Sequence, residues 1–259
     1  MQLEIASSPL IPAVGMFIAI LVFLEIGRWI GLRRLEVPGS RAGVGTVDGA
    51  VYALVALLIG FTFNGGAARF DARRGLVGDI TNSVSTAWQR IDMLPPEQQQ
   101  PIRDGMRRYV DALIASYHLN SESLDSPLHE PPNVTKAGQA LWAQAVAVCL
   151  TPAGEKARML LLPSLNELFD SVDKERLART VHPPRLIYGL LAAAVLIGAV
   201  FVGYALANAN RRNWMYMLGL AGTIASVTYV SFELEFPRLG HVRIDAADRT
   251  LSDLRSTMR

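Results

Sequence analysis

Four apolar blocks, each poor in charge, limit what this chain can fold into. A helix needs about 20 apolar residues to cross the hydrocarbon core of a bilayer, and each block has that length. The blocks are Leu10–Leu32, Val47–Ala68, Leu186–Leu206 and Trp214–Phe232. They predict an all-α membrane protein with four transmembrane helices in two pairs, flanking a helical soluble domain.

The same blocks divide the chain into parts. We expect transmembrane helices 1 and 2 in residues 1–68, a soluble domain in 69–185, transmembrane helices 3 and 4 in 186–236, and a C-terminal tail in 237–259. No Lys or Arg precedes the first block, and Arg33 and Arg34 follow it. These flanks indicate a retained span rather than a secretory signal.

The middle of the chain has the character of a soluble helical domain. Apolar residues recur at helical spacing in four segments, near residues 76–91, 102–117, 135–150 and 151–180. The stretch from Asn120 to Asn133 is rich in Ser, Pro, Asp and Glu, which is typical of a loop. We therefore predict four soluble helices and no sheet.

The distribution of arginine predicts the orientation in the membrane. Four spans place both termini on the same side as the soluble domain, and arginines near span ends are more numerous there than in the two hairpin loops. An excess of Lys and Arg marks the cytoplasm. We expect the soluble domain and both termini in the cytoplasm, although each hairpin loop is itself basic.

Composition argues against several functional classes. The net charge is only +2 and basic residues are mixed with acidic ones, so no nucleic-acid partner is expected. The single cysteine, Cys149, excludes an intrachain disulfide and falls in an apolar helix, as core cysteines do. No triad, zincin or P-loop spacing occurs, and the 4 histidines are scattered. We expect no enzyme activity, no cofactor and no metal site.

Several motifs resemble those of a known family, the bacterial bestrophin-like membrane proteins, which are largely uncharacterised. The matching segments, in chain order, are GFTF at Gly60–Phe63, RFDARR at Arg69–Arg74, RIDMLP at Arg90–Pro95, RYVD at Arg108–Asp111 and PRLGHVR at Pro237–Arg243. The resemblance covers most of the chain. One segment, Asp79–Ala87, departs from the family, which often has Glu-Ala-Asn-Ala-Ile-Gly-Thr-Ala there.

The resemblance implies kinship with bestrophins, which are oligomeric ion channels with the same order of spans, soluble helices and tail. It implies a homo-oligomer in the lipid bilayer of the bacterial inner membrane, with the second span lining a pore for inorganic ions. The alternative is a non-conducting membrane sensor or scaffold whose soluble helical domain binds a partner. Likeness of fold does not establish function, so candidate sites are needed.

The end of the second block holds the candidate pore-lining or gating residues, Phe61, Thr62, Phe63 and Asn64. Rings of Phe can gate a pore by excluding water, and Thr or Asn can contact a partly hydrated ion. The alternative is that Phe61 and Phe63 pack against lipid or neighbouring helices.

Charged residues in and beside the spans form two predicted groups. Glu25 and Arg28 lie three apart inside the first block, where an unpaired charge is costly, and are predicted to form an intramembrane ion pair. The second group is a charged cluster on the membrane side of the soluble domain, comprising Arg69, Asp71, Arg73, Arg74, Glu233 and Glu235. Its glutamates could concentrate cations at a pore or pair with the arginines.

Overall fold

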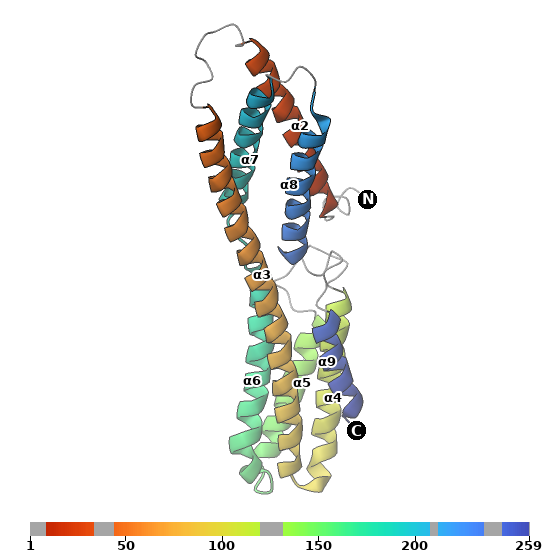
Figure 1. Ribbon diagram of the computed structural model, residues 1–259. Helices are drawn as coiled ribbons and strands as arrows, with labels where there is room; N and C mark the ends of the chain where they lie inside the picture. Colours follow the sequence, from red (N-terminus) through yellow and green to blue (C-terminus); the bar gives the residue numbers. More distant parts are fainter. Residues whose placement is uncertain (1–8, 34–43, 120–131, 208–211, 236–244, 259) are drawn as a thin grey trace. The chain divides into compact units, whose positions relative to one another are not determined.

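The computed structural model describes residues 9–33, 44–119, 132–207, 212–235 and 245–258. Over these residues it contains eight α-helices, one short 3₁₀ helix and no strand (Figure 1). The chain divides into two compact units, a membrane unit of Met1–Arg69 and Pro183–Phe236 and a soluble unit of Phe70–His182 and Pro237–Arg259. The predicted all-α fold is confirmed.

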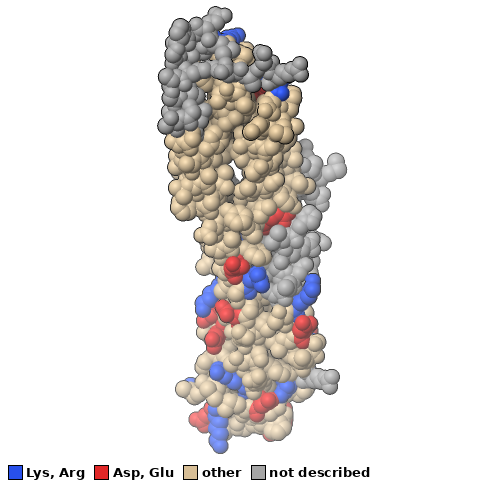
Figure 2. Space-filling view, viewed as in Figure 1, with Lys and Arg blue, Asp and Glu red and all other residues tan. Residues whose placement is uncertain are grey.

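Four helices are long and apolar enough to cross a membrane. They are α2 (Leu10–Arg33), the first part of α3 (Val44–Arg90), α7 (Arg185–Leu206) and α8 (Trp214–Glu235). The four predicted spans are thereby confirmed. In the view of Figure 2, few charged side chains lie on the described surface of the membrane unit, whereas many lie on that of the soluble unit.

The second span differs from the prediction in how it ends. The sequence predicted that the membrane helix ends at Ala68 and that a separate helix begins near Leu76. In the structure, α3 continues without interruption from Val44 to Arg90. The segment contains no proline. A glycine inside a helix costs only about 1 kcal/mol relative to alanine, so Gly65 and Gly66 do not end it.

Helices α2 and α7 of the membrane unit approach each other at glycines. A Cβ atom on Gly27 of α2 would lie 2.0 Å from the carbonyl oxygen of Val200, and one on Gly203 of α7 would lie 2.0 Å from that of Leu24. Lipid tails are as apolar as the helices, so close backbone packing replaces hydrophobic burial as the source of association. Helix α8 also packs against α2.

The soluble unit is built from the second part of α3 and five further elements. These are η1 (Ile91–Met93), α4 (Pro96–Leu119), α5 (Pro132–Cys149), α6 (Glu155–Thr180) and α9 (Asp245–Thr257). Each contributes large side chains to one buried apolar core, among them Ile80, Ile91, Ile102, Leu141, Leu165 and Leu251. Helix α4 begins at Pro96. Proline fits this position because the backbone N–H groups of the first turn have no partner within the helix, so the N–H that proline lacks is not missed.

Helix α9 lies in the segment for which the sequence predicted only a tail. It packs on α4, where Leu251 is fully buried and the Nε and Nη2 atoms of Arg255 donate to the two Asp111 carboxylate oxygens, each at 2.7 Å. Arg107 of α4 donates a hydrogen bond to the carbonyl oxygen of Met258. The C-terminal helix is therefore part of the soluble unit.

Candidate functional site

One face of the membrane part of α3 is left uncovered by the other helices of the membrane unit. Leu57, Phe61 and Asn64 are spaced four and three residues apart, so they share a face, and all three are exposed. Phe61 is the most open, at 66% exposure. The opposite face carries the buried Val55 and Gly66. The chain itself thus covers only one side of this span.

The Asn64 amide distinguishes this face from ordinary lipid-facing surface. Most described serine and threonine hydroxyls on the membrane helices bond a carbonyl four residues back, as Thr62 does with Leu58 at 2.8 Å and Thr228 with Ile224 at 2.9 Å. Among the described residues, no hydrogen-bond partner is found for the Asn64 amide. A polar group without a partner is costly in hydrocarbon. If Asn64 lies in hydrocarbon, its amide therefore needs water or a partner from beyond the described residues.

The structure separates the four candidate pore residues. Phe61 and Asn64 lie on the uncovered face, Phe63 is also exposed but points in another direction, and Thr62 points to the inside of the membrane unit. Successive residues of a helix are about 100° apart, so four consecutive side chains cannot share one direction. Only Phe61 and Asn64 are placed together.

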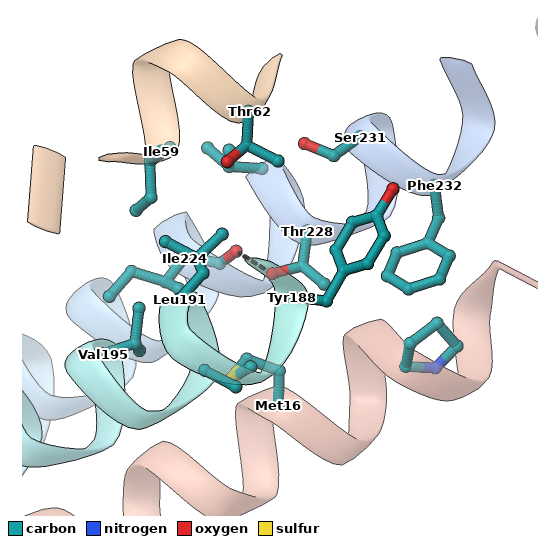
Figure 3. Close-up of a pocket in the computed structure, with 13 residues that line it drawn as sticks. Met16, Ile59, Thr62, Tyr188, Leu191, Val195, Ile224, Thr228, Ser231 and Phe232 are labelled. Carbon is teal, nitrogen blue, oxygen red and sulfur yellow. Dashed lines mark hydrogen bonds between the residues drawn. The ribbon is translucent and has the colours of Figure 1, made fainter. Parts of the chain in front are cut away.

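Thr62 faces a cavity of about 190 Å³ inside the membrane unit (Figure 3). The cavity lies between α3 on one side and α2, α7 and α8 on the other. Its lining is mostly apolar and consists of Pro12, Met16, Ile59, Thr62, Tyr188, Leu191, Ala192, Val195, Ile224, Val227, Thr228, Ser231 and Phe232. Three short hydroxyl side chains, from Thr62, Thr228 and Ser231, and the Tyr188 ring stand among these apolar groups.

Glu25 has a different ion-pair partner from the one predicted. Its carboxylate lies 3.3 Å from the guanidinium of Arg212, which precedes α8, and not within ion-pair distance of Arg28. The prediction used residue spacing within one helix only. In the folded protein, the start of α8 lies near the part of α2 that carries Glu25. Arg212 also lies over the ring of Trp214, 5.7 Å from its centre. Sequence inspection missed Arg212 because its approach is a tertiary contact.

Arg69, at the end of the membrane part of α3, and Glu235, the last residue of α8, form an ion pair inside the membrane unit. Two nitrogens of Arg69 donate to one carboxylate oxygen of Glu235, at 3.1 and 2.7 Å. Tyr229 hydrogen-bonds the carboxylate of Glu233. Both glutamates are buried, at 1% and 2% exposure. Within one chain they are held by these neighbours rather than displayed as a carboxylate surface.

The other members of the predicted charged cluster belong to the soluble unit. Arg73 is buried and donates to the carbonyl oxygens of Ala178 and Val181 at the end of α6, at 3.2 and 3.3 Å. Arg74 and Asp71 form an exposed pair at 3.9 Å. The residues of the predicted cluster are thus distributed over four separate contacts, and Arg73 donates to the carbonyl oxygens at the C-terminal end of a helix.

The thiol of Cys149 is buried in the core of the soluble unit. Burial raises its pKa, and the nearby Arg158 opposes this only in part. A raised pKa means less thiolate at neutral pH, so this thiol has the properties of an inert core cysteine. No group of three metal-ligating side chains occurs within the described parts of the chain.

Comparisons with known proteins agree with this architecture. The sequence profile of the bestrophin-like domain matches residues 18–248. A crystal structure of a bacterial bestrophin homolog from Klebsiella pneumoniae, phased with zinc, is similar with a TM-score of 0.64 at 17% identity, over 94% of this chain and 98% of that one. A point variant of that homolog gives a TM-score of 0.68 at 15% identity, over 95% and 98%. No curated protein sequence gives a match.

Proposed function

The chain belongs to the bestrophin-like family of membrane proteins, and from that premise we propose that it is a homo-oligomeric ion channel. The proposed pore is lined by the membrane part of α3, one helix from each copy. The observation that carries the proposal is the uncovered α3 face with the Asn64 amide, for which the described part of the chain provides no partner. A channel axis would supply the water that this amide needs.

The other membrane helices support the choice of α3. The exposed face of α2 carries Ile18, Val22 and Ile26, all apolar and suited to lipid. The exposed Thr223 and Ser226 of α8 donate to carbonyl oxygens four residues back, so lipid can cover them as well. The Asn64 amide makes no such hydrogen bond within its own helix, so the α3 face is the one best suited to line a pore axis.

Phe61 and Asn64 have separate roles in the proposal. Repeated around an axis, Phe61 would form an apolar ring that excludes water when the pore is narrow. Asn64, about one helical turn further along α3, would form a ring of amides that contacts a partly hydrated ion. The bacterial inner membrane, with the soluble unit in the cytoplasm, is the proposed location, supported by the arginine distribution.

Ion flux through the purified protein tests the proposal. We expect liposomes containing the full chain to release a trapped ion, and Phe61→Ala to increase that flux by removing the apolar ring. Asn64→Leu should reduce the flux. Phe63→Ala is the matched control. It also removes a phenylalanine ring, but one that is two residues further along α3 and points in a different direction. Liposomes that remain sealed over a range of ions and voltages would contradict the channel.

A partner-binding role is supported by a hollow in the soluble unit. It measures about 470 Å³ and is lined by Tyr109, Trp142 and Phe169, with Phe169 edge-on to both other rings. Aromatic side chains are enriched at binding interfaces. An image of the purified particle distinguishes the two proposals: a central axis lined by α3 favours the channel, and a particle without one favours the sensor or scaffold.

A further inference from the structure

The cavity beneath Thr62 has the size and chemistry of a binding site. An engineered apolar cavity of about 150 Å³ stays dry and binds benzene. The cavity in the membrane unit is somewhat larger, at about 190 Å³, is partly open to its surroundings, and has walls of mainly aliphatic and aromatic carbon. It therefore has room for one small ring with a polar substituent.

The cavity interrupts the contact between α3 and the other membrane helices. At one end the Tyr52 hydroxyl donates to the carbonyl oxygen of Gly198 at 2.8 Å. At the other end, Gly66 packs close to Leu234. Ile59 lies between these contacts and faces the cavity. Packed interiors contain few voids of this size, because wall atoms lose dispersion contacts on the empty side. A ligand would restore those contacts.

Ser231 gives the cavity a polar group that is available to a ligand. Four other hydroxyls on the membrane helices, those of Thr62, Thr223, Ser226 and Thr228, donate to the carbonyl oxygen four residues back. Within the described ranges the Ser231 hydroxyl makes no such bond. Figure 3 shows it directed toward Thr62, into the space between α8 and α3.

We propose that this cavity binds a lipophilic molecule of one ring and one hydroxyl group, of the size of phenol, that enters from the bilayer. Its ring packs between Ile59 of α3 and Leu191 and Val195 of α7, and its hydroxyl bonds Ser231. The bound molecule fixes α3 against α7 and α8. The proposal concerns binding alone and does not depend on whether the protein conducts ions.

Fluorine NMR of the full chain in nanodiscs tests the proposal with two matched probes, 4-fluorophenol and 4-fluorotoluene. Simple partition of a probe into lipid does not saturate, whereas binding to a site does. We therefore expect the bound signal of both probes to contain a saturable component that the corresponding unlabelled compound displaces. Ser231→Ala should weaken 4-fluorophenol binding about 2- to 12-fold, the effect of one lost hydrogen bond. Binding of 4-fluorotoluene should stay unchanged. Ser226→Ala, on the same helix but outside the cavity, should alter neither probe.

A cavity-filling variant provides the second arm. Ala192 lines the cavity, so Ala192→Phe should abolish saturable binding of both probes, and Ala192→Leu serves if the larger variant does not give a monodisperse particle. Saturable binding that survives in both Ala192 variants would overturn the proposal. So would an equal loss of both probes in Ser231→Ala, or no saturable binding in the unsubstituted protein, the result expected if a lipid chain fills the cavity.

Discussion

The membrane unit and the soluble unit are both helical, but different contacts hold them together. In the soluble unit, large side chains such as Leu161, Leu165 and Ile102 are completely buried. The membrane unit also buries Ile20 and Leu24, but α2 and α7 approach each other backbone to backbone at Gly27 and Gly203. Water makes burial of large apolar side chains favourable, whereas lipid does not distinguish them from its own chains. The solvent of each unit therefore determines which residues stabilise it.

The largest expected effect of a single substitution is in the core of the soluble unit. Leu165→Ala should lower the free energy of unfolding by about 2–5 kcal/mol, because it removes buried methyl groups and leaves a cavity. Leu177→Ala, on the same helix but at a position 61% exposed, should change it by less than about 0.5 kcal/mol. Equal effects would mean that α6 is not packed on the core as described.

The buried cysteine supplies the measurement. Cys149 is the only cysteine of the chain, so thiol labelling reports on the soluble unit alone. Its pKa is raised in the folded state, so the folded thiol has little thiolate at neutral pH and labelling occurs after the core opens. Leu165→Ala should accelerate labelling strongly and Leu177→Ala should not.

The next effect concerns the two adjacent arginines after the membrane part of α3. Arg73→Met should destabilise the soluble unit by about 1.5–3 kcal/mol, because it removes charged hydrogen bonds to the carbonyls of Ala178 and Val181. Arg74→Met removes only a long, exposed pair with Asp71 and should have little effect. Urea unfolding followed by Cys149 labelling compares the two variants, and a larger loss in Arg74→Met would contradict the assigned contacts.

Replacement of glycine by alanine should change the stability of the membrane unit in opposite directions at two positions of α2. Alanine is a better helix former than glycine, so Gly15→Ala, whose new Cβ meets no atom within 4 Å, should be neutral or slightly stabilising. Gly27→Ala places its Cβ against the backbone of α7 and should destabilise the membrane unit by about 1–3 kcal/mol. The temperature at which the detergent-solubilised protein loses its monodisperse peak measures this difference. A stabilised Gly27→Ala variant would show that the helices do not meet at this glycine.

The sequence predicted the elements of the fold better than their contacts. Length and hydropathy identify the spans because the bilayer imposes both on each helix separately. The partner of Glu25 was predicted wrongly as Arg28, because Arg212 reaches it only through the folded hairpin. Helix α3 is continuous because the low helix propensity of Gly65 and Gly66 costs little, and the rest of the fold outweighs that cost.

The candidate site was predictable in part. Helical periodicity alone could have separated Thr62 from Phe61 and Asn64, since it fixes the angle between successive residues. The available hydroxyl of Ser231 could not have been found this way, because Thr228 and Ser226 on the same helix look equivalent in sequence and bond their own helix instead. Helix α9 was also missed, although its apolar residues Leu251 and Leu254, and Met258 directly after it, have helical spacing.

The smallest expected effect is at α9, which is held by apolar contacts and by one exposed ion pair. Arg255→Ala should destabilise the packing of α9 on α4 by about 0.2–1 kcal/mol, because surface pairs gain little over their interactions with water. Leu251→Ala, at a completely buried position of the same helix, should cost more. Hydrogen exchange of the α9 amides measures both. The effect of Arg255→Ala should shrink in high salt and that of Leu251→Ala should not, since salt screens charges but leaves apolar burial intact. If salt leaves both variants unchanged, the Asp111–Arg255 pair does not contribute to holding α9.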